Sequence, residues 1–324
     1  MLSSEILKRY RIRKGGQFRL GDIDPGDTAG LDIDKAGAKE ILAASVKRLS
    51  DLQERLHADR RWAILMILQG IDTAGKDGVI KHVMSGVNPQ GCHVTSFKAP
   101  SDLDLDHDFL WRTTIALPAR GRIGIYNRSY YEETVVVRVH PELLARQRLP
   151  AQLVTADIWT ERFQDINNFE LHLARNGILP IKFYLHISKK EQLRRLLARI
   201  DDPKKRWKFA YGDVEERALW DAYAHAYEET IRHTATADSP WYVVPADHQM
   251  VHPPCRCRHS GGAARGARSA FSQAQRCRDR GAGKGPRRAH GAGLTRRMAM
   301  PSWPLPPTVW ITVASTRGSA ATAS

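Results

Sequence analysis

The chain has 324 residues, 42% of them hydrophobic, which is enough to bury the core of one large domain or of two small ones. Four cysteines are too few for a disulfide framework in a chain of this length. The N-terminus lacks the apolar core of a signal peptide, and no apolar run reaches the roughly 18 residues that span a bilayer. We therefore expect a cytoplasmic protein with no membrane partner. The net charge is +15, but most of it lies in residues 249–324, which hold 12 Arg and one Lys against a single acid. Residues 1–248 are nearly neutral, with 37 basic and 34 acidic residues. We therefore expect no nucleic-acid partner.

The N-terminal part of the chain predicts an arm and a helix ahead of the first strand. Residues 1–34 are polar and rich in turn residues, which predicts an extended arm. Residues 36–56 carry apolar side chains at helical spacing. Residues 62–68 contain an unbroken apolar run and are predicted to form the first strand of the domain.

A glycine-rich segment follows this strand directly and reads GIDTAGKDG. A strand, a Gly-x4-Gly-Lys turn and a helical pattern through residue 84 are the layout of a phosphate-binding P-loop, in which glycine backbone N–H groups and Lys76 face phosphate oxygens. Asp72 adds a carboxylate inside the loop, and Asp77 replaces the Ser or Thr that ordinarily binds Mg²⁺; a plain surface turn is the alternative interpretation. The expected phosphate-binding residues here are Gly70, Ala74, Gly75, Lys76, Asp77, Gly78 and, in the following helix, Lys81.

The chain then alternates between strands and helices up to His248. We predict strands at 93–97, 124–126, 181–187 and 241–245, and helices at 107–117, 191–200 and 212–233. This alternation predicts an α/β fold with a parallel sheet, helices on both faces and phosphates at the carboxyl ends of the strands. We interpret Tyr223 and Tyr227, in the last helix, as packing residues rather than ligand contacts.

Three polar stretches follow predicted strands. Residues 97–101 follow the second strand, and the ring of Phe97 fits either core packing or stacking on a base. Residues 127–132 follow the third strand, where P-loop proteins place a second carboxylate for Mg²⁺. A basic segment after the fourth strand predicts a lid that closes on phosphates, with a solvated charged face as the alternative. Its cations are Arg195, Arg199, Lys204, Lys205, Arg206 and Lys208.

Taken together, these motifs resemble the polyphosphate kinase 2 family. The matching segments are GIDTAGKDG (70–78), GVNPQG (86–91), SFKAPS (96–101), DHDFLWR (106–112), NRSYYEE (127–133), DPKKRWKF (202–209) and PWYVVPADH (240–248). The resemblance covers nearly the whole chain up to His248, and the segments occur in the order of the family.

The resemblance implies a thymidylate-kinase-like P-loop fold, a three-layer α/β sandwich spanning residues 35–248, with a helical lid at about 190–212. It implies reversible phosphoryl transfer between inorganic polyphosphate and a nucleoside mono- or diphosphate. Asn127 with Glu132 downstream looks like the group of the family that acts on monophosphates as well as diphosphates. We also expect a homo-oligomer.

The same resemblance implies roles for individual residues. The catalytic residues would be Asp72, Lys76, Arg128, Arg195 and Arg199, and the nucleotide-binding residues Phe97, Lys98, Pro100 and Asn127. Asp72 and Glu132 would hold Mg²⁺ (or Mn²⁺), and Lys205 and Lys208 would bind phosphates from the lid. An ATP-dependent nucleotide or small-molecule kinase of the same fold is the first alternative, which an assay with polyphosphate as the sole donor would separate. A basic nucleic-acid-binding protein is the second, which deletion of the basic residues 249–324 would separate.

The last part of the chain, residues 249–324, has a different composition. It is rich in Arg, Gly, Ala and Pro and shows no helical or strand periodicity, which predicts a disordered segment. Read one base later, the codons of residues 249–251 must encode Lys or Arg, then Trp, then Phe, Ser, Tyr or Cys. The family typically continues with Lys-Trp-Phe or similar after PADH. We therefore predict an out-of-frame tail that begins after His248, and an inactive product of a damaged reading frame is a further alternative.

Overall fold

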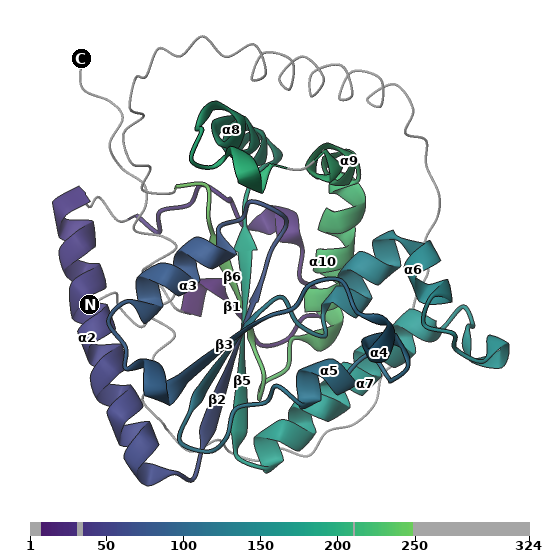
Figure 1. Cartoon of the computed structure of the whole chain (residues 1–324), viewed down its shortest axis with the longest axis horizontal. Coiled ribbons are helices and arrows are strands. Elements are labelled where there is room, and N and C mark those ends of the chain that lie inside the picture. The colour runs from purple at the N-terminus through teal and green to yellow at the C-terminus, as the bar shows by residue number, and fades with distance from the viewer. Residues whose placement is uncertain (1–7, 31–34, 210, 249–324) are drawn as a thin grey trace.

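The computed structural model describes residues 8–30, 35–209 and 211–248 (Figure 1). The tail at 249–324, which we expect to be disordered and out of frame, lies outside these residues and stays a prediction. Of the helices in the described part of the chain, none is both long and apolar enough to cross a membrane.

A six-stranded sheet forms the centre of the domain, in the order β1-β6-β5-β2-β4-β3 (Figure 1). The strands are β1 (Arg11–Ile12), β2 (Ala63–Gln69), β3 (Cys92–Ser96), β4 (Ile123–Asn127), β5 (Ile178–His186) and β6 (Trp241–Pro245). Neighbouring strands from β6 to β3 are parallel, and β1 is antiparallel to β6. The predicted α/β fold with a parallel sheet is confirmed, with one antiparallel edge strand that the sequence did not indicate.

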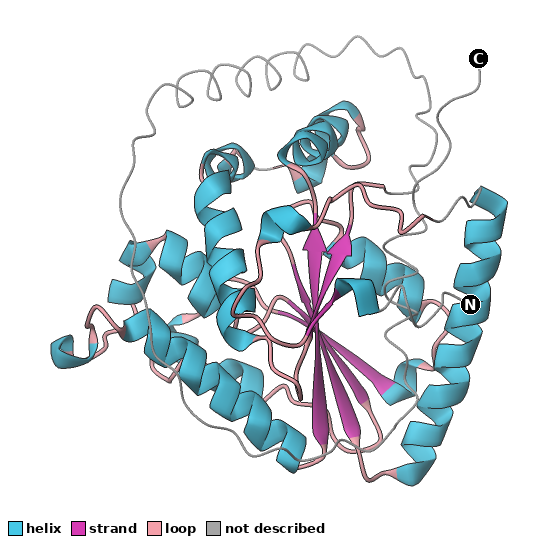
Figure 2. Ribbon diagram, turned by 180° about the vertical axis from the view of Figure 1, so that it is seen from behind, coloured by secondary structure: helices cyan, strands magenta, loops and turns pink. Residues whose placement is uncertain are grey.

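Helices cover both faces of the sheet (Figures 1 and 2). On one face lie α2 (Lys35–Asp59) and α3 (Lys76–Met84), and on the other α7 (Ile158–Arg175) and α10 (Trp220–Thr234). At the carboxyl end of the strands lie α8 (Lys189–Asp201) and α9 (Gly212–Ala218) (Figure 1). The short helices are α4 (Asp102–Leu105), α5 (Trp111–Thr114), α6 (Pro141–Ala145), η1 (Leu20–Asp22), η2 (Pro89–Gly91), η4 (Ala151–Leu153), η5 (Arg206–Lys208) and the π-helical η3 (Glu133–Val137).

The central strand β2 is apolar along its whole length because both of its faces are covered. Met66 and Leu68 pack into the core beneath α2 and α3, whereas Leu65 and Ile67 pack into the core beneath α7 and α10. Successive side chains of a strand point to opposite faces, so a strand buried on both sides has no polar alternation. This is why an unbroken apolar run predicted the strand that carries the P-loop.

Two predicted helices differ from the structure. The helix expected at 107–117 is reduced to α5, because the Asp108 carboxylate accepts a hydrogen bond from the backbone N–H of Leu110 at 2.9 Å and stabilises a turn there. The helix expected at 212–233 is divided into α9 and α10 at Leu219, whose N–H bonds to the carbonyl oxygen of Glu216.

Two other segments were not anticipated. The sequence interpretation assigned no helix to residues 158–175, where α7 covers one face of the sheet. The described part of the N-terminal arm packs against the domain, with Tyr10, Phe18 and Leu20 buried in its cores. The arm therefore contributes both an edge strand and apolar side chains to the fold.

Candidate active site

The segment from Gly70 to Lys76 forms a tight loop between β2 and α3. A Cβ atom on Gly70 would lie 2.9 Å from the Cβ of Ala74 and 3.0 Å from the carbonyl oxygen of Leu185, so only glycine fits. Gly75 has a φ of 107° at the start of α3, a conformation that favours glycine. Both glycines of the predicted P-loop are thus required by its geometry, and the N-terminus of α3 opens onto the loop.

Lys76 points back into this loop. Its Nζ donates a hydrogen bond to the carbonyl oxygen of Gly70 at 2.5 Å, and the residue is 8% exposed. Burial lowers the pKa of Lys76, while the nearby carboxylates of Asp72 and Glu132 act in the opposite direction. Burial disfavours the charged form of the ammonium group, and an anion bound beside it would stabilise that form. Lys76 is therefore suited to binding an anion.

Arg128 follows β4 and reaches toward the P-loop. Its guanidinium group pairs with Asp72 at 2.7 Å and with Glu132 at 3.2 Å. Burial opposes the charge of Arg128, but the two carboxylates outweigh it and raise the pKa of the guanidinium above its usual value. The backbone N–H of Arg128 bonds to Leu68 at the end of β2, which fixes this turn beside the loop.

The residue in the usual Ser/Thr position, Asp77, lies at the rim of the loop. Its carboxylate accepts a hydrogen bond from Nδ2 of Asn127 at 2.8 Å and lies 3.9 Å from Nζ of Lys208. The predicted nucleotide residue Asn127 and the predicted lid residue Lys208 therefore both contact the P-loop helix.

Arg195, on α8, binds the loop from outside. The side chain is 8% exposed, and its Nη1 donates to the carbonyl oxygens of Thr73 at 2.9 Å and Ala74 at 3.0 Å. Its Nη2 donates to the carbonyl oxygen of Ala246, and its Nε to the carboxylate of Glu191 at 2.7 Å. Arg195, predicted as a catalytic lid residue, is placed by the structure as a support of the loop backbone.

The other predicted lid residues lie farther from the loop. Arg199 pairs with Asp213 of α9 at 3.5 Å, and Lys205 pairs with Asp202 at 2.8 Å. Lys81 is exposed on α3.

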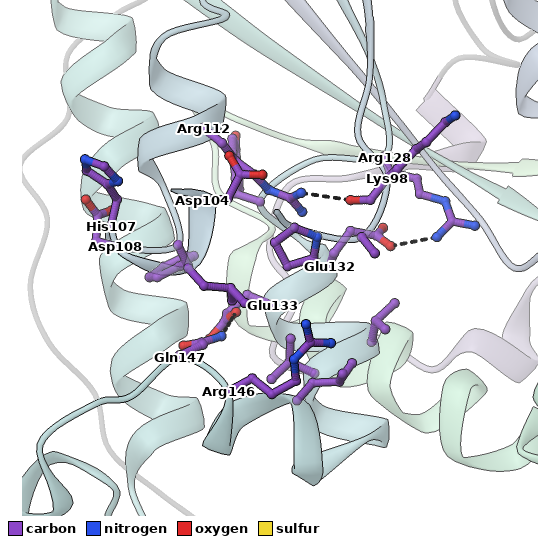
Figure 3. Close-up of a pocket in the computed structure, with 18 of the residues that line it drawn as sticks. Lys98, Asp104, His107, Asp108, Arg112, Arg128, Glu132, Glu133, Arg146 and Gln147 are labelled. Atoms are coloured by element: carbon purple, nitrogen blue, oxygen red, sulfur yellow. Dashed lines mark hydrogen bonds and ion pairs between the residues drawn. The ribbon is translucent and has the colours of Figure 1, made fainter. Parts of the chain in front are cut away.

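Two cavities meet at Arg128 and Glu132. The first, which we call the outer cavity, has a volume of about 190 Å³, and Figure 3 shows its lining side chains. Its polar residues include the predicted Lys98, together with Arg112, Glu133, Arg146 and Gln147; Pro100 also lines it. The second, which we call the P-loop cavity, has a volume of about 180 Å³ and is lined by Gly70, Ile71, Asp72, Arg128, Glu132, Val136, Gln192, Glu216, Tyr223 and Tyr227.

Ordered contacts shape the outer cavity. Nη1 of Arg112 donates to the carbonyl oxygen of Lys98 at 2.8 Å, and the Gln147 amide donates to Glu133 at 2.7 Å (Figure 3). The ring of Phe97 is 8% exposed and packs edge-on against Tyr126, with its centroid 4.9 Å away, which corresponds to the packing alternative.

Several cavity residues were missed by the sequence interpretation. Arg112 stands within the recognised segment DHDFLWR, which offered a signal that was not used. Arg146, Gln147 and Glu216 have no local pattern that sets them apart. Tyr223, interpreted as a packing residue, borders the P-loop cavity, whereas Tyr227 is buried at its base.

The carboxylates of Asp72 and Glu132 offer the oxygen ligands that Mg²⁺ prefers. They flank one guanidinium group and line one cavity beside the P-loop. No group of three or more His, Cys, Asp or Glu residues suited to a metal occurs among the described residues. This donor set fits Mg²⁺, which is commonly held by one or two carboxylates, with substrate phosphates and water completing its coordination.

A glycine-rich loop between a central parallel strand and a helix, in a sheet covered by helices on both faces, places the chain in the P-loop class of α/β proteins. The chain belongs to the polyphosphate kinase 2 family. The model of this family, described as Polyphosphate kinase 2, matches residues 32–253.

Curated and solved relatives agree with this assignment. A protein of Rhodopseudomonas palustris named ADP-polyphosphate phosphotransferase is 51% identical over 245 residues, which cover 74% of this chain and 83% of the relative. An AMP/ADP-polyphosphate phosphotransferase of Meiothermus ruber is 45% identical over 241 residues, which cover 74% of this chain and 86% of the relative. The crystal structure of polyphosphate kinase 2 from Arthrobacter aurescens TC1 superimposes with a TM-score of 0.67 at 42% identity, covering 73% of this chain and 81% of that one.

Proposed function

We propose that this chain transfers a phosphoryl group between inorganic polyphosphate and a nucleoside mono- or diphosphate. The observation that carries the proposal is the meeting of two cavities at Arg128 and Glu132, one beside the P-loop and one lined by Lys98 and Arg112. A phosphotransferase needs a donor and an acceptor site that share a transfer point. The names of the two curated relatives support polyphosphate as one substrate and AMP or ADP as the other.

From the residues that line each cavity we infer which substrate it would bind. The P-loop cavity would take the phosphates, since Gly70, Ile71 and Asp72 of the loop line it together with Arg128, and Lys76 binds the carbonyl oxygen of Gly70. The outer cavity would take the nucleotide, with Lys98 and Arg112 near its phosphates and its apolar wall near the base.

Charge neutralisation at the transfer point would come from Lys76 and Arg128. Phosphoryl transfer depends on in-line positioning and on stabilising the equatorial oxygens, more than on covalent chemistry by the protein. Arg128, which pairs with both carboxylates here, would turn its donors toward those oxygens when the substrates are present.

Asp72 and Glu132 would hold Mg²⁺ (or Mn²⁺). When bound, the ion would neutralise part of the charge of the phosphates. Both carboxylates pair with Arg128 here, so the same two side chains that hold this guanidinium group would hold the ion.

The proposal extends to the setting of the enzyme. We place it in the cytoplasm, where nucleotides are available, as a homo-oligomer without nucleic-acid or membrane partners. The near-neutral charge of residues 1–248 supports the exclusion of nucleic acid.

The deciding experiment uses polyphosphate as the sole phosphoryl donor. Purified protein is incubated with Mg²⁺ and with AMP, ADP or GDP in separate reactions, and the products are separated by ion-exchange chromatography. Formation of the next higher nucleotide is expected. Product with ATP as donor and none with polyphosphate would support the alternative, an ATP-dependent kinase of the same fold.

A further inference from the structure

His140 lies between two carboxylates, one of which, Glu216, lines the P-loop cavity. Its Nδ1 is 3.2 Å from Oε1 of Glu142, and its Nε2 is 3.1 Å from Oε2 of Glu216. Carboxylate oxygens only accept hydrogen bonds, so both contacts are hydrogen bonds only when both ring nitrogens carry a proton. The geometry therefore offers the protonated imidazolium one carboxylate acceptor at each ring nitrogen.

The two partners of His140 belong to different parts of the domain. His140 and Glu142 begin α6, which follows the π-helical segment after Glu132, whereas Glu216 lies on α9 beyond the basic segment at 202–209. The hydroxyl of Tyr223, on α10, donates to the same Oε2 of Glu216 at 2.6 Å. One carboxylate oxygen thus collects two donors from two other elements.

The carboxylates that line the P-loop cavity are matched by cations. Asp72 and Glu132 both pair with Arg128. Glu216 pairs with His140, and within the described ranges it makes no ion pair with a lysine or an arginine. Its charge is therefore compensated by a group whose protonation changes near neutral pH.

We propose that His140 is the counter-ion of Glu216, and that its proton sets the affinity of the P-loop cavity for polyphosphate. This inference rests on the proposed function, since it takes polyphosphate as the anion of that cavity. With His140 protonated, the Glu216 charge is neutralised beside the bound anion. With His140 neutral, the Glu216 charge remains and repels the phosphates.

The surroundings of His140 give the direction of the pH effect. Partial burial opposes its charge, but the hydrogen bonds and charges of Glu216 and Glu142 outweigh it and raise the pKa of His140 above its usual value of 6.5. Burial and the Glu216 contact also raise the pKa of Tyr223, so its hydroxyl keeps its proton over the same range. Polyphosphate affinity should be full below pH 6.5 and fall as pH rises through the raised pKa.

The test measures polyphosphate binding directly, without nucleotide, by titration calorimetry between pH 6 and pH 9. In the wild-type protein we expect the Kd to rise roughly five- to tenfold over this range, the effect of one partly screened charge near the anion. His140→Gln should bind weakly at every pH, and Glu216→Gln should bind tightly at every pH. Both variants should lose the pH dependence that His140 gives the wild type. The Kd of His140→Gln should stay near the wild-type value at pH 9, and that of Glu216→Gln near the wild-type value at pH 6.

The control variant is His57→Gln, which removes an exposed histidine on α2 and should keep the wild-type profile. Thermal melting of each variant checks that the fold is retained. A His140→Gln protein with the wild-type pH dependence, or a Glu216→Gln protein without improved affinity at pH 9, would overturn the inference.

Activity assays separate this inference from the proposed function. If the wild-type protein binds polyphosphate but phosphorylates no nucleotide from it, the proposed function is wrong, and the binding titrations still decide the role of His140. If the wild-type protein is active, its KM for polyphosphate should depend on pH in the same way as its Kd for polyphosphate. The KM for the nucleotide should have the same pH dependence in the wild type and in the His140→Gln variant.

Discussion

The guanidinium group of Arg195 donates a hydrogen bond to the carbonyl oxygen of Thr73 at 2.9 Å, within the phosphate-binding loop. Thr73 has a φ of 70°, which is uncommon for a residue with a Cβ atom. The contact thus helps to hold the loop in a conformation that a free turn would not favour. Arg195 therefore supports the backbone of the loop.

Replacing Arg195 with methionine should reduce both stability and activity. The substitution keeps some packing volume but leaves the carbonyl oxygens of Thr73 and Ala74 without the Arg195 donor, and it removes one of the two arginines that pair with Glu191. We expect a loss of about 2–4 kcal/mol in the free energy of unfolding, the usual cost of removing one partner from a buried charged network. Urea unfolding of the two proteins measures it.

Arg199 provides the contrasting case on the same helix. Its side chain is one-quarter exposed, and its pair with Asp213 is long, at 3.5 Å. Arg199→Ala should cost at most about 1 kcal/mol of stability but should lower kcat more than it weakens nucleotide binding, because a lid cation acts after the substrates are bound. Equal loss of stability in the Arg195 and Arg199 variants would mean that the two arginines share one structural role.

Lys76 should be essential for turnover. Its Nζ lies at the loop, and Lys76→Ala should lower kcat by ~10²–10³, as expected for a charge contact made chiefly in the transition state. Lys47→Ala removes an exposed lysine from α2 and should retain most of the activity. Steady-state kinetics of both variants, with melting curves, gives the comparison. Near-normal turnover of Lys76→Ala would contradict the P-loop assignment.

Glu132 should control the metal requirement. Glu132→Gln keeps the shape of the side chain but removes one of the two carboxylates proposed for Mg²⁺, so the Mg²⁺ concentration for half-maximal rate should rise by roughly tenfold or more. Glu161→Gln, at an exposed position on α7, serves as the charge-matched control. A Mg²⁺ dependence equal to that of the control would exclude Glu132 as a ligand.

The sequence predicted the parts of the site that depend on local pattern. The apolar run of β2 and the spacing of Gly70, Gly75 and Lys76 lie within one short segment, so their arrangement could be inferred directly. The contact of Arg195 with Thr73 joins residues 122 apart, and that of His140 with Glu216 joins residues 76 apart. Pairs of this kind arise from the packing of α8 and α9 on the sheet, which no spacing in the sequence records.

The helix break at Leu219 illustrates a second limit. Apolar periodicity continues across it, because α9 and α10 both turn apolar side chains inward, and so the pattern predicted one long helix. Across this turn the hydroxyl of Tyr223, on α10, donates a hydrogen bond to the carboxylate of Glu216, on α9, at 2.6 Å.

The reading frame after His248 can be tested by expressing two proteins. The first has the sequence as written, and the second continues in the frame that begins with Lys or Arg, Trp and a residue such as Phe. The aromatic residues of the restored frame would each stabilise the fold by ~1.5–3 kcal/mol if buried, against a total stability of ~5–15 kcal/mol. We expect a higher Tm and higher polyphosphate-dependent activity in the second protein. Equal values in both would mean that the printed tail is tolerated.

Lys182 of β5 and Glu170 of α7 form a buried ion pair. Nζ of Lys182 donates to Glu170 at 2.7 Å, and both side chains are almost completely shielded from solvent. The hydroxyls of Tyr130 and Tyr131 donate to the other oxygen of Glu170 at 2.9 and 2.6 Å, so the pair anchors the turn that carries Arg128.

Removing one member of this pair should be far more damaging than removing both. Lys182→Met leaves the Glu170 charge buried and should cost ~3–5 kcal/mol, whereas the double variant Lys182→Met/Glu170→Gln leaves no unpaired charge and should recover much of that loss. Urea unfolding of the wild type, both single variants and the double variant gives the coupling energy. Tyr131→Phe, which removes one donor to Glu170, should lower stability in the wild type by ~1–2 kcal/mol and by less in the double variant. Additive costs in this cycle would show that the two charges act independently, and that the tyrosines alone hold the turn in place.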